Sequence, residues 1–140
     1  MERVVPPDCA RVLFWAAFLS LGSSLAAARW RVYDGMTVAA AVFLCSVNYW
    51  RRPVYGWRRN IDIINTVTCL VYQTYRCFAT NWFYRLGYLA STYTGIGFFF
   101  LGRHLDKLNV RHGTYAHMFV HILGNIGNIF LFLGLKTKII

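Results

Sequence analysis

Apolar residues gather in five blocks separated by short polar connections. The blocks run over residues 12–28, 36–50, 61–78, 82–101 and 115–135. Each holds about 15 to 21 residues, and roughly 20 apolar residues are enough for a helix to cross a bilayer. None shows the alternation of a barrel strand, and a helix satisfies its own backbone hydrogen bonds in lipid. The pattern therefore predicts an all-α, polytopic membrane bundle of about five transmembrane helices, in a single domain over residues 1–140.

The composition favours lipid over water as the medium around these blocks. Hydrophobic residues make up 57% of the 140 residues and charged residues only 14%, whereas soluble domains carry about 25% charged residues. A soluble chain of this length would lack the polar surface to cover such a core, because small domains leave much of their surface exposed. Buried charges and imidazoles then become exceptional features that need an explanation.

Positive charge lies in the connections between the blocks. The formal charge is +10, and basic residues in short connections suit anionic lipid headgroups better than nucleic acid. With five spans, the N-terminus and the second and fourth connections share one side, which carries nine Lys and Arg residues against six on the other. This imbalance favours an N-terminus on the inner side, either cytoplasmic or matrix.

The second connection combines arginines with aromatic residues. Five of its residues are predicted to bind phospholipid: Arg51, Arg52, Trp57, Arg58 and Arg59. Guanidinium groups can bind phosphate oxygens in pairs, while tryptophan sits at the level of the glycerol backbone. Cardiolipin is one such lipid. The alternative is that the arginines only set the topology.

Five polar side chains are expected near the same side of the membrane. Ser46 and Asn48 close the second block, Asp62 opens the third, and His117 and His121 lie in the first two turns of the fifth. The two histidines are four residues apart and so share one helix face, a spacing that lets both bind one metal ion. The alternative is a hydrogen-bonding stripe that continues through Asn125 and Asn128 and packs against neighbouring helices.

Two further features have ordinary structural explanations. Asp62 can pair with Arg58 or Arg59 one turn earlier and also benefits from the helix dipole. Small residues permit close helix approach in membranes, and we expect this role for four glycines: Gly95, Gly97, Gly124 and Gly127.

The order of these motifs resembles the CREST superfamily of membrane hydrolases, which includes alkaline ceramidases and progestin and adipoQ receptors. The matching segments are Ser46-Val-Asn-Tyr-Trp50, Arg58-Arg-Asn-Ile-Asp62 and His117-Met-Phe-Val-His121. The resemblance implies a bundle in which His117 and His121 bind zinc while Ser46 and Asp62 stabilise or activate its water. In the family, a histidine four residues after the serine completes the zinc site, and this chain has Trp50 there. The resemblance thus implies a shortened, inactive relative.

Two hypotheses for function follow. The first is a non-catalytic accessory subunit of a larger membrane complex of the mitochondrial inner membrane, such as the ATP synthase or respiratory chain. Its partners would be other membrane subunits and phospholipids such as cardiolipin, and it would need no cofactor. The second is a zinc-dependent lipid amidase with Ser46 and Asp62 as catalytic residues and His117 and His121 as metal ligands. We favour the first, because a catalytic zinc needs three protein ligands.

Overall fold

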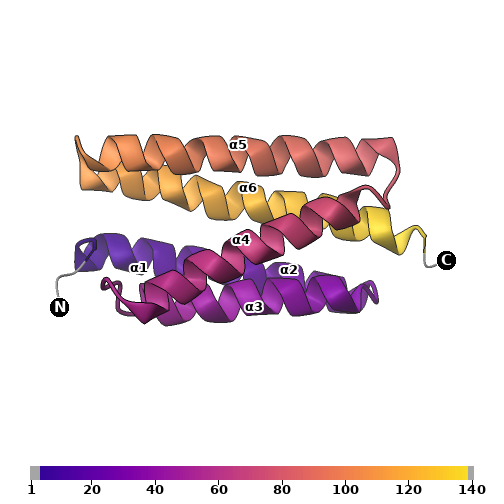
Figure 1. Ribbon diagram of the computed structural model, residues 1–140, viewed down its shortest axis with the longest axis horizontal. Coiled ribbons are helices and arrows are strands. Elements are labelled where there is room, and N and C mark those ends of the chain that lie inside the picture. Colours follow the sequence, from indigo (N-terminus) through magenta and orange to yellow (C-terminus); the bar gives the residue numbers. More distant parts are fainter. Residues whose placement is uncertain (1–3, 139–140) are drawn as a thin grey trace.

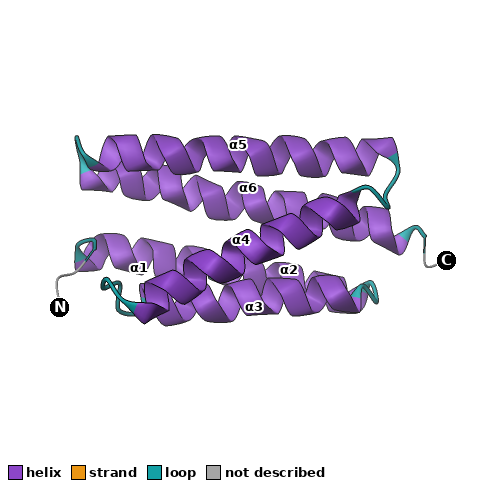
Figure 2. Cartoon of the chain, in the orientation of Figure 1, coloured by secondary structure: helices purple, strands orange, loops and turns teal. Residues whose placement is uncertain are grey.

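The computed structural model describes residues 4–138, and within that range every regular element is a helix (Figures 1 and 2). The helices are α1 (Pro7–Ala16), α2 (Phe18–Arg29), α3 (Tyr33–Trp50), α4 (Trp57–Cys77), α5 (Trp82–Asp106) and α6 (Val110–Lys136). Only Ala17 separates α1 from α2, and the two run on as one rod. The described chain therefore forms five rods joined by short connections.

Local chemistry explains where the helices begin. Asn81 and Asn109 cap α5 and α6, since their side chains accept hydrogen bonds from the backbone N–H groups of Tyr84 and Arg111. The connection before α4 ends at Gly56, whose φ of 145° is a conformation that L side chains rarely adopt. Each of the two asparagine caps satisfies a backbone N–H group that the first helical turn leaves unpaired.

All five predicted blocks lie within helices except at Ala17 and Phe78, which confirms the all-helical class. Several helices extend beyond their blocks: α4 begins at Trp57 and α5 continues to Asp106. Two rods are long and apolar enough to cross a membrane, Pro7–Arg29 and Val110–Lys136. The other three rods do not reach the same mean hydropathy over a membrane-spanning length.

The helices α5 and α6 form the closest pair in the bundle. They run antiparallel (Figure 1), and glycines on both helices bring them together. A Cβ atom added at Gly127 would lie 2.8 Å from Thr92 Oγ1, and one added at Gly134 would lie 2.7 Å from the Cβ atom of Tyr84. Small residues at such an interface let two backbones approach and increase van der Waals contact.

By contrast, α4 crosses the bundle obliquely. It starts beside α3 and ends near α5 and α6 (Figure 1). The hydroxyl oxygens of Tyr88 on α5 and Thr74 on α4 are 3.2 Å apart. Arg85 donates hydrogen bonds to the carbonyl oxygens of Phe78 and Thr80. The predicted tight connection between the third and fourth blocks thus exists, but the two helices diverge away from it.

Polar contacts hold α4 to α3 near both ends. At one end Ser46 donates to Asp62 over 2.7 Å. At the other, Asp34 accepts from Tyr72 over 2.8 Å and pairs with Arg76, also at 2.8 Å. These contacts fix the angle at which α4 crosses α3. They leave the bundle open on the side where α4 faces α5.

Large apolar side chains cover the outside of the bundle. Examples from five helices, each more than 60% exposed, are Trp15, Leu25, Leu44, Ile64, Val71 and Phe100. Meanwhile several polar side chains are buried inside: Ser20, Ser23, Ser24, Ser46, Gln73, Thr92 and Asn128. A water-soluble protein would favour the opposite distribution.

Candidate functional site

A cavity of about 370 Å³ lies between α3, α4, α5 and α6, and Ser20 of α2 also lines it. Its walls are mostly apolar and include Val42, Ile63, Leu70, Ile96 and Phe99. On α4 it extends from Asp62 to Gln73, which corresponds to about 16 Å along a helix. A mostly apolar cavity with a few polar side chains is the usual form of a small-molecule site.

Four of the five polar residues that the sequence placed on one membrane side line this one cavity: Ser46, Asp62, His117 and His121. Asn48 is not among the lining residues. The Ser46 hydroxyl donates to Asp62 Oδ1 over 2.7 Å. Ser46 comes from the end of α3 and Asp62 from the start of α4, so the hydrogen bond joins two helices at one end of the bundle. Their predicted convergence is confirmed.

The predicted ion pair of Asp62 is wrong. Among residues 4–138 the ion pairs are Arg76 with Asp34 and Arg111 with Asp8. The guanidinium of Arg58 lies over the Trp57 ring and that of Arg59 over the Tyr55 ring, at 5.4 and 5.5 Å. Asp62 faces the interior instead, where a hydroxyl group from α3 is its partner.

The two histidines stack along one face of α6 beside Trp50. Their ring centroids are 5.5 Å apart, and the Trp50 ring meets His117 edge-on at 5.4 Å. Phe99 of α5 contacts His117 from another side at 6.0 Å. Trp50 therefore fills the space next to the histidine pair, on the face of α3 that also carries Ser46 one turn earlier.

Two nitrogen atoms at this end of the cavity have no hydrogen-bond partner among the described residues. They are Nε1 of Trp50 and Nε2 of His121. Trp50 is only 7% exposed, so water does not freely satisfy its N–H group. A buried polar atom without a partner costs free energy, so these two nitrogen atoms are where a bound molecule, water included, would gain a hydrogen bond.

The residues present do not complete the zinc site that the resemblance implies. Within residues 4–138, no three His, Cys, Asp or Glu side chains come together in a way that could hold a metal ion. Asp62 is bound to Ser46, His112 is exposed, and Trp50 has no lone pair to offer a metal. The two histidines thus remain one ligand short of the three that a catalytic zinc uses.

A second polar group continues the cavity toward the middle of the bundle. Ser23 donates to Asn125 Oδ1 over 2.6 Å, and Asn125 donates to the His121 carbonyl oxygen over 2.7 Å. Gln73 donates to Asn128 Oδ1 over 2.9 Å. The predicted stripe through Asn125 and Asn128 therefore hydrogen-bonds to neighbouring helices, as expected if these residues serve helix packing.

Sequence reasoning missed four polar residues that line the cavity: Ser20, Thr66, Gln73 and Thr92. Gln73 could have been found, because it lies on the face of α4 that also carries Asp62 and Cys69, at helical spacing. Ser20 and Thr92 lie within apolar stretches and gave no comparable signal.

The predicted phospholipid-binding residues lie at the same end of the molecule as the polar part of the cavity. Arg51, Arg52 and Trp57 are exposed, whereas Arg58 and Arg59 are half-buried and stack on aromatic rings. The N-terminal end and the connection between α5 and α6 lie at this end too (Figure 1). This grouping is the one expected for five membrane crossings, while lipid binding by these residues stays a prediction.

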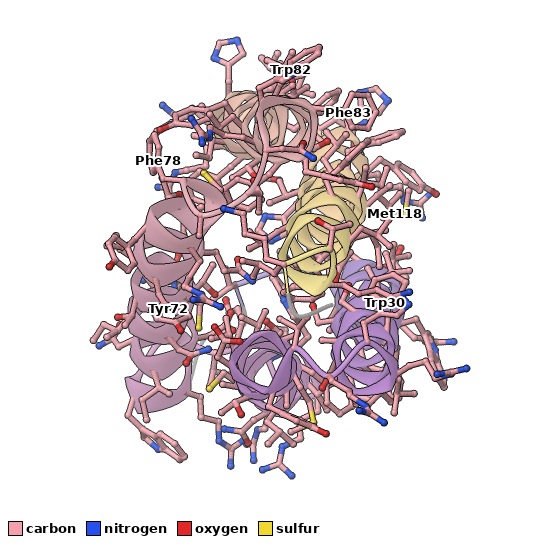
Figure 3. All side chains as sticks on the ribbon, turned by 90° about the vertical axis from the view of Figure 1, so that its right-hand side faces the viewer. Trp30, Tyr72, Phe78, Trp82, Phe83 and Met118 are labelled. Carbon is pink, nitrogen blue, oxygen red and sulfur yellow. The ribbon has the colours of Figure 1, made fainter. Side chains whose placement is uncertain are left out.

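The cavity opens sideways between α4 and α5. Ile63 and Val67 of α4 and Phe100 of α5 line it and are 44, 54 and 65% exposed. Figure 3, which looks along the bundle from the end that carries Phe78 and Trp82, shows α4 and α6 on opposite sides of the interior, with Met118 on the far side of α6 from α4. The opening is therefore apolar and faces outward from the bundle.

Comparisons with family models, with curated proteins and with solved structures found no match to this chain.

Proposed function

We propose that this protein crosses a membrane about five times and holds a lipid inside its helical bundle without chemically changing it. The observation that carries the proposal is the cavity with apolar walls, a lateral apolar opening and unpaired nitrogen atoms on Trp50 and His121. Such a cavity suits a ligand that is apolar along its length and polar at one end.

Five crossings are supported by the apolar surface and by the two ends of the bundle. Large apolar side chains are exposed on every rod, and hydrocarbon is the solvent in which such a surface is stable. The ionisable side chains of the interior face a cavity instead of the surroundings, as they do in membrane proteins.

A non-catalytic role is supported by Trp50. Its ring lies against His117 at 5.4 Å, where a third metal ligand would have to approach the histidine pair. An accessory subunit of a larger membrane complex fits a chain that binds lipid but has no complete catalytic group. A place in the mitochondrial inner membrane, in the ATP synthase or respiratory chain, belongs to the same proposal and is supported only by the basic connections.

A zinc-dependent lipid amidase is the second candidate. It is favoured by the convergence of Ser46, Asp62, His117 and His121 on one cavity, which the CREST resemblance implies for a hydrolase. The number of available metal ligands argues against it, because a catalytic zinc would be bound by only two histidines instead of three protein ligands.

One preparation tests both candidates. The protein is purified in a mild detergent, and its bound lipid and its zinc content are measured, with a native gel run alongside. We expect lipid at about one molecule per chain, less than a tenth of an equivalent of zinc, and migration together with other membrane proteins.

Stoichiometric zinc that is lost in a His117→Ala variant would support the amidase and overturn the non-catalytic proposal. If no lipid is retained, the proposal that the cavity holds a lipid would be overturned. Migration as an isolated chain near 16.2 kDa would contradict the accessory-subunit role.

A further inference from the structure

We propose that the indole N–H group of Trp50 anchors the polar end of the bound lipid, and that this lipid is an uncharged, single-chain amphiphile with a carbonyl or hydroxyl oxygen at its head. The inference deepens the proposed function and rests on it. It assigns to Trp50 a positive role in binding, beyond displacing a metal ligand.

The first step is the unpaired donor. Trp50 lines the cavity, and its Nε1 atom, which can only donate a hydrogen bond, is buried and has no partner among the described residues. Tyr49 and His117 hold the ring in position, with centroids at 4.6 and 5.4 Å. A rigid, buried donor with no protein partner specifies an acceptor atom on the ligand.

The second step is the charge of the head. No Lys or Arg is among the described residues that line the cavity, and the carboxyl group of Asp62 is part of its wall. A carboxylate or phosphate head would be buried beside Asp62 without a cation to pair with, which is strongly unfavourable. A quaternary ammonium head would leave the Trp50 donor unsatisfied. An amide, ester or alcohol avoids both costs.

The third step is the position of the ligand's acyl chain. Beyond Trp50 the walls are formed by Val42, Leu70, Ile96 and Phe99, and the opening between α4 and α5 is lined by Ile63 and Phe100. About 370 Å³ is near the lower end of the range for ligand cavities, which runs from roughly 300 to 1,000 Å³. One acyl chain fits this space better than two, with its far end leaving through the lateral opening.

The experiment compares three probes that share a chain of the same length: hexadecanamide, hexadecanoate in its ionised form, and hexadecane. Binding to the delipidated protein in detergent is titrated by native mass spectrometry. The variant is Trp50→Phe, which keeps an aromatic ring and removes the donor. The matched control is Trp82→Phe, because Trp82 is 72% exposed at the other end of the bundle and does not line the cavity.

We expect hexadecanamide to bind the wild-type protein more tightly than hexadecanoate. Trp50→Phe should weaken hexadecanamide about two- to tenfold, the net effect of one neutral hydrogen bond, and leave hexadecane binding unchanged. Trp82→Phe should change neither. The hexadecane titration also shows whether the Trp50→Phe cavity is intact.

Equal affinity of wild type and Trp50→Phe for hexadecanamide would overturn the anchoring role, and tighter binding of hexadecanoate would overturn the uncharged head. In both cases lipid binding itself would stand. Failure of all three probes to bind the wild-type protein would instead overturn the proposed function together with this inference. A loss of hexadecane binding in Trp50→Phe equal to that of hexadecanamide would show a packing role and would also count against the anchor.

Discussion

Asp62 shows what a single ionisable residue does in this bundle. Its partner is the Ser46 hydroxyl from the neighbouring helix, although two arginines stand one turn before it in the sequence. The motifs placed Ser46 and Asp62 on the same membrane side, so their meeting could be predicted. The choice of partner could not, because it depends on the rotation of α4, which directs Asp62 inward while Arg58 and Arg59 stack on aromatic rings.

The Ser46–Asp62 hydrogen bond should couple α3 to α4 energetically. In a double-mutant cycle with Ser46→Ala and Asp62→Ala, we expect a coupling of about 0.6 to 1.7 kcal/mol, the range found for hydrogen bonds between membrane helices. Unfolding in mixed micelles measures it. The control is Thr68→Ala, because Thr68 is exposed and bonds only to the Ile64 carbonyl oxygen of its own helix. A Thr68–Asp62 coupling of similar size would contradict a specific contact.

At the scale of helices, the order and type of the elements followed from the apolar blocks, but their packing did not. Gly127 and Gly95 lie against the partner helix as expected, at 2.8 and 3.5 Å for an added Cβ atom. Gly97 and Gly124 have no atom within 4 Å of such a Cβ, so their predicted packing role is wrong. Gly134, at 2.7 Å from Tyr84, was missed, since spacing alone does not show which glycine faces the partner helix.

Substitutions at two glycines test this packing directly. Gly134→Ala should destabilise the protein by about 1 to 3 kcal/mol, because its Cβ atom would overlap Tyr84 and Thr80. Gly97→Ala is the matched control on the facing helix and should be neutral or stabilising by up to about 1 kcal/mol, from helix propensity. Chemical unfolding of the two variants measures both effects. Equal destabilisation would show that α5 and α6 do not pack as described.

For the whole molecule, the five rods could be read from the sequence, and so could the ends at which the connections meet. The cavity could not, because it arises from the oblique path of α4, which depends on contacts such as Arg76 with Asp34. No local pattern in α4 encodes a crossing angle. The polar residues of the site were thus predictable as a group, whereas the space between them was not.

The proposed five crossings can be tested by labelling, because they place the connection after α3 and the end of α6 on opposite sides of the membrane. Single cysteines introduced by Arg52→Cys and Lys136→Cys, in a background with Cys9, Cys45, Cys69 and Cys77 replaced by serine or alanine, should react with a membrane-impermeant maleimide from opposite sides of a sealed vesicle. The basic end should face the inside. Labelling of both cysteines from the same side would exclude five crossings.

The divergence of α4 from α5 has a consequence for how the protein would respond to its surroundings. If the proposed function holds, an occupant that enters between Ile63 and Phe100 would exchange with the bilayer without passing through water. Occupancy would therefore follow the mole fraction of that lipid in the adjacent leaflet, and a poorly soluble lipid would equilibrate as readily as a soluble one. The fraction of filled protein would then report on membrane composition.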